Sequence, residues 1–300
     1  MNAALPSSVH LIERSDYWRA PALIPDPDES IPGYKEWQHF VIFGQGWVLV
    51  FNLNIDGLPH PTGRHPQYSH PARAVTIFSA AQWTGQVDRC GDTELRLGSL
   101  DARFGDAGMR WRSGCYEIWQ HQAGIQLEIS LQPVAIPSLT HNIRLAERSH
   151  LSWCLVPRLL ASGWVDVDGE RHEFDERGAY HDHNWGRFDW GGDFSWDWGC
   201  AVPEDPLEDW TLVFARMNSA DRHRTTATSA FLLERGQHIR YFRNAEVSFT
   251  SGEGSHDPPA GRIPPAAAVL LASAGRCDQA IQTSANGFKK PCTHQLGCCS

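Results

Sequence analysis

The stretch Cys115–Val134, CYEIWQHQAGIQLEISLQPV, predicts a β-hairpin and decides the fold class. Two apolar runs, Cys115–His121 and Ile125–Val134, flank a short loop that contains Gly124. The second run alternates between apolar residues (Ile125, Leu127, Ile129, Leu131) and polar ones (Gln126, Glu128, Ser130, Gln132). Such alternation is typical of an antiparallel strand with one buried and one hydrated face.

The same pattern continues on both sides of this hairpin. Trp37–Phe43 and Trp47–Leu53 flank a Gly-Gln-Gly loop, and a further turn is predicted at Asp168-Gly169. Strand-like runs recur about every ten residues, whereas helical periodicity is nearly absent. The sequence therefore predicts an all-β, antiparallel chain.

Composition argues against several classes of protein. The chain has 300 residues, more than a typical domain of roughly 100–200. Its net charge of -9 offers no basic surface to nucleic acid, which is therefore not an expected partner. No basic start followed by an apolar run opens the chain, and no apolar stretch approaches the roughly 20 residues that span a bilayer. We expect a soluble, cytoplasmic protein with no transmembrane segment; transient membrane contact and the oligomeric state stay open.

The segment Gly178–Gly186, GAYHDHNWG, concentrates groups that donate, accept or carry protons. On a strand its side chains would form two sets, with Tyr180, Asp182 and Asn184 on one face and His181, His183 and Trp185 on the other. A one-residue slip in register would exchange the two faces. Because Asp182 lies within an aromatic, low-charge stretch, it is either a buried structural carboxylate or a working one.

Tryptophan is unusually frequent, with 13 Trp against 3 Met. On the predicted strands Trp37 shares a face with His39, and Glu117 shares one with Trp119. Rings aligned in this way form either a core stripe or the wall of a pocket. As candidate substrate-binding residues we take Trp37, His39, Glu117, Trp119, Asn184, Trp185, Trp190, Trp196 and Trp198.

Other site types find less support. His181-x-His183 begins like a cupin metal site, but the Glu expected five residues later is replaced by Phe188. The eight cysteines form no C-x-x-C pair, which argues against a zinc knuckle or a thioredoxin motif. Neither a G-x-S-x-G elbow nor a phosphate loop is present. We expect no bound metal.

The segment Tyr180–Gly186, together with Lys35–Phe40 (KEWQHF) and the many tryptophans, resembles the carotenoid 1,2-hydratase family, also called hydroxyneurosporene synthase-like or AttH-like. The resemblance implies two lipocalin-like β-barrel or sandwich domains, an apolar substrate cavity and no metal or organic cofactor. We place these domains at residues 1–145 and 146–275, with a loose tail at 276–300.

The resemblance also implies roles for single residues. Tyr180 and Asp182 would belong to the active site, with Asp182 donating a proton to an isolated carbon–carbon double bond. The family hydratases place a His and a Trp on an upstream strand, for which this chain offers His150 and Trp153. The Glu-Trp-Trp-Tyr of many members is replaced here by Glu36–His39, EWQH, which puts a carotenoid substrate in doubt.

The resemblance thus implies a cofactor-independent hydratase or cyclase that protonates a double bond in a hydrophobic polyene, isoprenoid or natural-product intermediate. Burial must then raise the pKa of Asp182 above its ordinary value of roughly 3.9. Neutral His181 or His183 would hydrogen-bond or reprotonate Asp182, and tryptophan rings would stabilise a carbocation. The alternatives are a Diels–Alderase-like pericyclase of the same fold and a lipocalin-like carrier that leaves its hydrophobic ligand unchanged.

Overall fold

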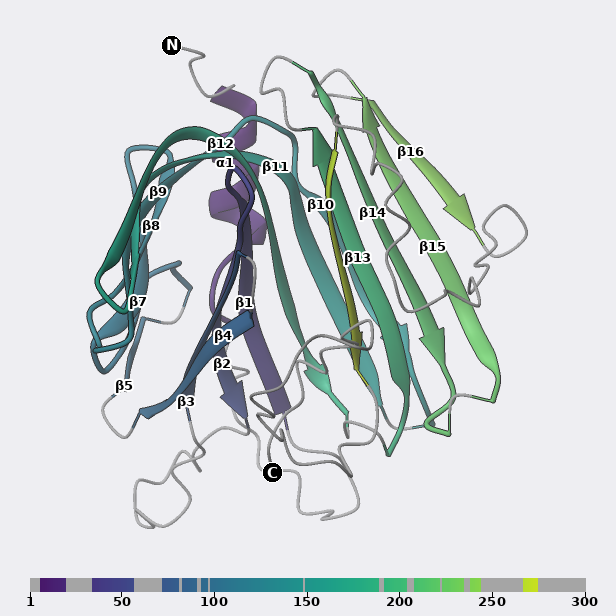
Figure 1. The fold of residues 1–300 in the computed structure, drawn as a ribbon. Coiled ribbons are helices and arrows are strands. Elements are labelled where there is room, and N and C mark those ends of the chain that lie inside the picture. Colours follow the sequence, from purple (N-terminus) through teal and green to yellow (C-terminus); the bar gives the residue numbers. More distant parts are fainter. Residues whose placement is uncertain are drawn as a thin grey trace, which may run out of the picture. The chain divides into compact units, whose positions relative to one another are not determined.

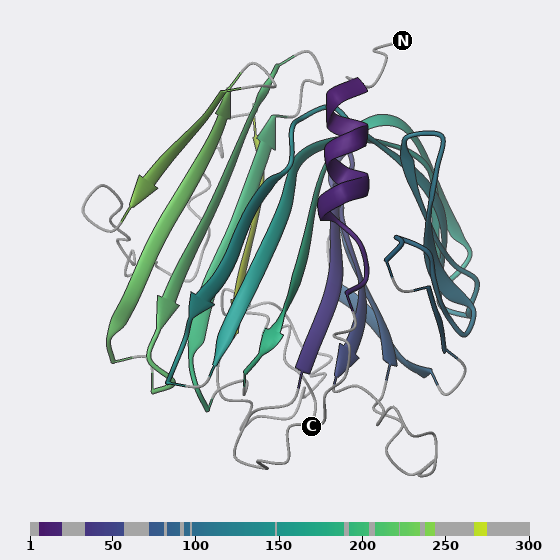
Figure 2. The same cartoon turned by 180° about the vertical axis from the view of Figure 1, so that it is seen from behind.

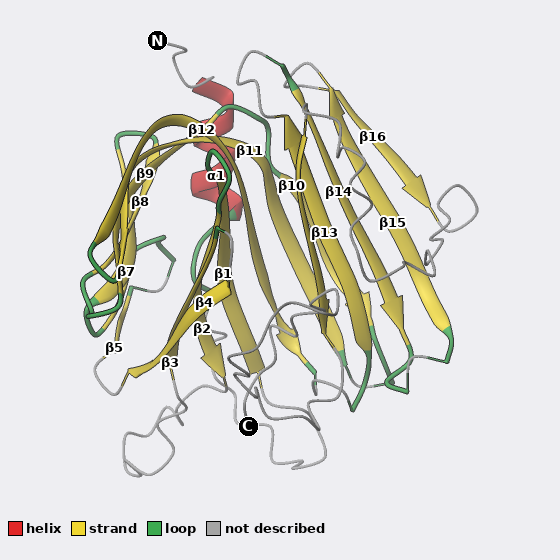
Figure 3. Cartoon of the chain, viewed as in Figure 1, coloured by secondary structure: helices red, strands yellow, loops and turns green. Residues whose placement is uncertain are grey.

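The computed structural model describes residues 6–19, 34–56, 72–80, 83–90, 93–96, 98–147, 149–188, 192–203, 208–221, 223–234, 238–243 and 267–274. These residues form one helix and seventeen strands, which confirms the all-β prediction (Figures 1 and 3). Residue contacts are concentrated within two compact units of the chain, unit 1 (Met1–Phe188) and unit 2 (Asp189–Ser300).

Unit 1 is built on a twelve-stranded antiparallel sheet that curls into a nearly closed, barrel-like form (Figure 1). Its strand order is β4-β3-β2-β1-β12-β11-β9-β8-β7-β6-β5, and β10 pairs with β11. The strands are β1 (Tyr34–Phe43), β2 (Val48–Asp56), β3 (Ala72–Ser79), β4 (Trp83–Cys90), β5 (Thr93–Leu95), β6 (Ala102–Phe104), β7 (Ala107–Arg112), β8 (Cys115–Gln120), β9 (Ile125–Pro133), β10 (Ser138–Arg144), β11 (His150–Val167) and β12 (Glu170–Arg187). Both glycine-loop hairpins predicted from the sequence are present, as β1–β2 and β8–β9.

Strands β11 and β12 form a hairpin of two 18-residue strands. Asp168 and Gly169 make its turn with positive φ angles of 53° and 92°, as the sequence predicted. The register between β11 and β12 shifts twice, between Val156 and Leu159 and between Ala161 and Gly163. These irregularities interrupt the period-2 pattern of the hairpin.

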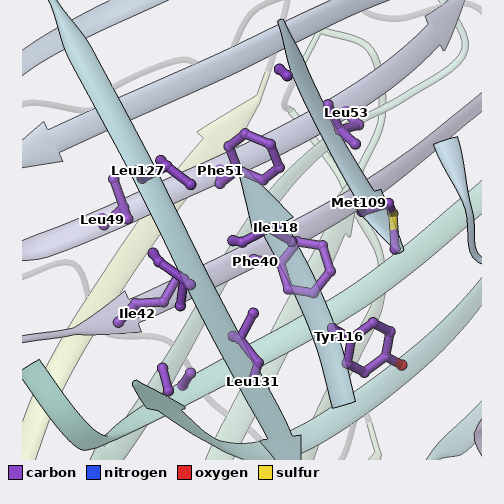
Figure 4. Close-up of a cluster of buried hydrophobic side chains, with 14 of the residues drawn as sticks. Phe40, Ile42, Leu49, Phe51, Leu53, Met109, Tyr116, Ile118, Leu127 and Leu131 are labelled. Carbon is purple, nitrogen blue, oxygen red and sulfur yellow. The ribbon is translucent and has the colours of Figure 1, made fainter. Parts of the chain in front are cut away.

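The hydrophobic core lies on one face of the unit 1 sheet (Figure 4). Strand β9 is buried at every second residue from Ile125 to Pro133, which confirms the predicted alternation. The side chains labelled in the close-up come from β1, β2, β7, β8 and β9: Phe40, Ile42, Leu49, Phe51, Leu53, Met109, Tyr116, Ile118, Leu127 and Leu131. The opposite face of β1 and β12 carries His39 and Asp182, which are also buried.

The helix α1 (Pro6–Ser15) is the one helix among the described residues, in keeping with the near absence of helical periodicity in the sequence. Ile12 is fully buried in the core, and Trp18 packs on Phe104 with ring centroids 5.8 Å apart. The Trp18 backbone N–H also donates to the Ser99 carbonyl at 2.9 Å. Figure 2 shows α1 in front of the strands, near the top of the view. A helix of ten residues is too short to be stable alone in water, so α1 depends on these tertiary contacts.

Unit 2 contains a five-stranded antiparallel sheet in the order β16-β15-β14-β13-β17. Its strands are β13 (Ser195–Pro203), β14 (Trp210–Asn218), β15 (Thr225–Glu234), β16 (His238–Arg243) and β17 (Ala267–Ala274). The two compact units meet after Phe188, whereas we expected a domain boundary after residue 145. The two positions differ because β11, beyond residue 145, pairs with β9 before it. The tail at 276–300 lies outside the described residues.

Two further sequence expectations concern the described residues. None of the helices in the described ranges is long and apolar enough to cross a membrane. Four cysteines in these ranges, Cys90, Cys115, Cys154 and Cys200, have free thiols.

Candidate active site

Strand β12 places the segment Tyr180–Trp185 between β1 and β11. His39 on β1 lies opposite Asp182, and Trp37 lies opposite Asn184. On β11, Trp153 lies opposite Asn184. Residues opposite each other in a sheet share a face, so six side chains form what we call the Asp182 face: Trp37, His39, Trp153, Tyr180, Asp182 and Asn184.

Asp182 is only 4% exposed and is held by hydrogen-bond donors. The Tyr180 hydroxyl donates to its Oδ2 at 2.8 Å, and the Asn184 Nδ2 donates to its Oδ1 at 2.6 Å. Burial raises the pKa of Asp182 to about 6, although the hydrogen bonds from Tyr180 and Trp153 and the nearby His181 favour the charged form. The carboxyl group can therefore hold or release a proton near neutral pH.

His39 adds a second titratable group to the Asp182 face. Its side chain is 5% exposed. Burial, together with the charge of His181, lowers its pKa to about 3, so the imidazole is neutral near pH 7. On β2, Asn52 lies opposite His39, and its Oδ1 has no hydrogen-bond partner among the described residues. The row Asn52, His39, Asp182 thus crosses three neighbouring strands.

His181 and His183 lie on the other face of β12, within a buried cluster that we call the Asp16 network. It comprises Asp16, Glu36, His181 and His183. His181 Nε2 lies 2.9 Å from Asp16 Oδ2, and its Nδ1 lies 3.0 Å from the His39 carbonyl oxygen. His183 Nδ1 lies 2.9 Å from Asp16 Oδ1, and its Nε2 lies 2.7 Å from Glu36 Oε1.

Within the Asp16 network, the carboxylates and the histidines stabilise each other's charged forms. Burial alone would raise the pKa of Asp16, but the attraction and hydrogen bonds of His181 and His183 hold it well below its ordinary range. Burial would likewise lower the pKa of His183, but its bonds to Asp16 and Glu36 raise it. The pKa of Tyr116, whose hydroxyl donates to Asp16, is raised by burial and by that carboxylate. The network is thus a buried set of paired charges.

This geometry separates the four residues that we expected to be catalytic. Tyr180 and Asp182 lie together, as the period-2 pattern predicted. His181 and His183 instead direct their ring nitrogens to Asp16, to Glu36 and to the His39 carbonyl on the other face. Both ring nitrogens of His183 lie within 2.9 Å of carboxylate oxygens of Asp16 and Glu36, on the face of β12 opposite Asp182.

The expected substrate-binding residues are also divided. Trp37, His39 and Asn184 belong to the Asp182 face. Trp185 lies on the face of the Asp16 network, with the Arg19 guanidinium 3.7 Å from the centre of its ring. Trp196 and Trp198 are on β13 in unit 2, and Trp190 lies outside the described residues.

Glu117 and Trp119 are on β8, which β9 and β11 separate from β12. Glu117 forms an ion pair with Arg110, and the same guanidinium lies 5.7 Å from the centre of the Trp119 ring. These two side chains are therefore not brought next to Asp182 by the sheet.

Sequence reasoning missed Asp16, Glu36 and Asn52 as site residues. Asp16 lies 165 positions before His181 in the sequence, and Asn52 becomes informative only once its register with His39 is known. Trp153 was named only beside His150, and it is Trp153, opposite Asn184, that belongs to the Asp182 face. His150 lies opposite Arg187, at the end of β12. In the described parts of the chain, no group of three or more His, Cys, Asp or Glu residues is arranged to hold a metal ion.

Comparison with known proteins supports the fold. Neither a scan against protein-family models nor a search of curated proteins gives a match. Among solved structures, a provisionally identified AttH from Nitrosomonas europaea is similar with a TM-score of 0.52 and 17% identity, over 70% of this chain and 68% of that one. Kievitone hydratase from Nectria haematococca is similar with a TM-score of 0.51 and 13% identity, over 70% of this chain and 64% of the hydratase, which is less than two thirds of its length. The resemblance to AttH-like proteins is thus confirmed at the level of the lipocalin-like fold.

Proposed function

We propose that this protein is a hydratase or cyclase that protonates a carbon–carbon double bond of a hydrophobic polyene, isoprenoid or natural-product intermediate, with Asp182 as the acid. The observation that carries the proposal is the state of Asp182, a buried carboxyl group with a pKa raised to about 6. Keeping an ionisable group buried costs free energy, and such groups concentrate at functional sites.

The neighbours of Asp182 suit this chemistry. Tyr180 and Asn184 fix both carboxyl oxygens, so the acid has a defined orientation. After Asp182 transfers its proton, the substrate becomes a carbocation and the carboxylate remains held by the same donors. Trp37 and Trp153 flank Asn184 on the neighbouring strands, and their ring faces would stabilise the cation by about 2 kcal/mol or more in a desolvated site.

Capture of the cation decides the reaction class. Addition of water gives hydration, and attack by a second double bond of the substrate gives cyclisation. The similarity in fold to a protein named kievitone hydratase supports the first course. A carrier of hydrophobic ligands gains nothing from a buried carboxyl group whose pKa is raised, so the state of Asp182 favours an enzyme.

The test is turnover of a panel of isoprenoid and polyketide polyenes in H2-18O, followed by mass spectrometry. We expect a product heavier by one labelled water, formed at least ~100-fold more slowly by Asp182→Asn. Because the protonated carboxyl is the active form, kcat/KM should be constant below about pH 6 and fall about tenfold per pH unit above it.

A matched control is Asp175→Asn, which changes an exposed Asp on the same strand and should retain turnover. An isomeric product of unchanged mass would assign a cyclase. Equal ligand binding by wild type and Asp182→Asn, without turnover of any polyene, would favour a carrier and overturn the proposal. A kcat/KM that rises with pH would make Asp182 a base rather than an acid.

A further inference from the structure

We propose that His39 is the base that completes the reaction begun by Asp182, and that Asn52 orients the water from which His39 takes a proton. This inference rests on the proposed function. Asp182 supplies the proton that forms the carbocation. His39 is then the group that accepts the proton from the water that captures this cation.

Asn52, His39 and Asp182 lie side by side on one face of the sheet. Asn52, His39 and Asp182 occupy one row across β2, β1 and β12, each directly opposite the next in antiparallel register. Opposite Cβ atoms in such pairs lie ~4.5–5.5 Å apart, so one small molecule can contact neighbouring side chains. All three residues are buried, with exposures of 9%, 5% and 4%. An acid and a base on the same face of rigid strands can therefore reach the two ends of one double bond.

The side-chain oxygen of Asn52 is a buried hydrogen-bond acceptor with no partner among the described residues. A buried acceptor without a partner costs about 1–3 kcal/mol, so native structures contain few of them. The Asn52 Oδ1 is one among the described residues. A water that donates one hydrogen to this oxygen and the other to His39 would present its lone pair to the substrate cation.

The proton balance closes with these groups. Asp182 gives its proton to one alkene carbon, and the water oxygen forms a bond to the neighbouring cationic carbon. His39 removes a proton from the resulting oxonium, and the imidazolium returns that proton to the Asp182 carboxylate. The net reaction is alkene plus water to alcohol, and both side chains regain their starting states. In a cyclisation His39 would instead take the proton whose loss forms the final double bond.

The state of His39 is consistent with this role. Burial and the charge of His181 hold its pKa low, so the ring is neutral and one nitrogen carries a lone pair while Asp182 is protonated. An oxonium is a strong acid, so even a weak base removes its proton. The His39 carbonyl accepts from His181 Nδ1 at 3.0 Å, which anchors this residue to the Asp16 network.

The experiment is performed in D2O with the full chain and three probes: farnesol, squalene and lycopene. For a probe that wild type converts, we expect His39→Gln to form product at least ~100-fold more slowly. The same variant should still exchange deuterium into the alkene C–H positions of recovered substrate, because Asp182 protonates and deprotonates reversibly. Asp182→Asn should do neither.

The outcomes separate the two proposals. One contrary result is that His39→Gln forms product as fast as wild type, and another is that it loses both deuterium exchange and product formation. Either result would overturn the role of His39 while leaving Asp182 as the acid. Product or exchange in Asp182→Asn, or no reaction of any probe with wild type, would overturn the proposed function and this inference with it. His121→Gln, at an exposed His paired with Glu128, is the control for a histidine change. If His39→Gln does not fold, His39→Asn is the second variant, with the same expected split between product and exchange.

Discussion

At the scale of single residues, the buried carboxyl group of Asp182 opposes stability. Its folded pKa of about 6 exceeds the ordinary 3.8, and at ~1.4 kcal/mol per pH unit the difference amounts to roughly 3 kcal/mol. A raised pKa gives stability that is complete below about pH 4 and is lost as the pH rises through about 6. At neutral pH the ionised form therefore weakens the fold.

We predict that Asp182→Asn raises the free energy of unfolding by about 1–3 kcal/mol at pH 8, because the neutral amide carries no buried charge. The gain should shrink to near zero at pH 4, where Asp182 is protonated. Urea unfolding of wild type and Asp182→Asn at pH 4, 6 and 8 measures this difference in unfolding free energy. A variant less stable than wild type at pH 8 would show that the hydrogen bonds of the carboxylate outweigh its desolvation.

The sequence predicted this residue better than its surroundings. Alternation along Gly178–Gly186 correctly placed Tyr180, Asp182 and Asn184 on one face. Alternation does not reveal what each face meets. The partner of His181 and His183 is Asp16, about 165 positions earlier in the chain, and no local pattern links such distant groups.

At the scale of elements, β11 depends on one glycine where its register shifts. Gly163 has a φ of 148°, and an added Cβ would lie 2.2 Å from the Glu128 carbonyl oxygen on β9. A side chain therefore has neither the backbone conformation nor the space it needs.

We predict that Gly163→Ala lowers the free energy of unfolding by about 2 kcal/mol or more. The matched control is Gly85→Ala on β4, where the nearest atom would be an ordinary 3.5 Å from the new Cβ. That control should stay within ~1 kcal/mol of wild type. Thermal or urea unfolding of both variants provides the comparison, and equal stabilities would contradict a strained Gly163.

Elements with regular alternation were predictable, whereas those shaped by distant contacts were not. The β8–β9 hairpin follows its pattern because one face packs on the core throughout. Strand β11 changes register twice while it pairs with β9, β10 and β12, and helix α1 is stabilised by packing rather than by propensity.

At the scale of the whole molecule, the Asp16 network joins parts of unit 1 that are remote in sequence. Asp16 follows α1, bonds to His181 and His183 on β12, and accepts from Tyr116 on β8. Glu36 on β1 adds the second carboxylate, which also accepts from the Tyr34 hydroxyl at 2.9 Å. Composition and spacing along the chain do not show these long-range connections.

We predict that Asp16→Asn lowers the free energy of unfolding by about 3–5 kcal/mol at pH 6, because it leaves two buried histidines facing an uncharged amide. The pKa of Asp16 is lowered, so its stabilisation is present above about pH 4 and is lost as the pH falls. The pKa of His183 is raised, so its stabilisation is present below about pH 6.5 and is lost as the pH rises. The loss of unfolding free energy caused by Asp16→Asn should therefore be greatest between about pH 4 and about pH 6.5.

Urea unfolding from pH 3 to pH 9 tests this window, with Asp182→Asn and Asp175→Asn measured in parallel. The two buried aspartates lie on opposite faces of one sheet and should respond with opposite signs at neutral pH, while the exposed Asp175 should change stability by less than ~0.5 kcal/mol. A loss below ~1 kcal/mol for Asp16→Asn would mean that its charge is not what joins α1 to β12. The stability of unit 1 would then rest on apolar contacts such as those of Ile12 and Trp18.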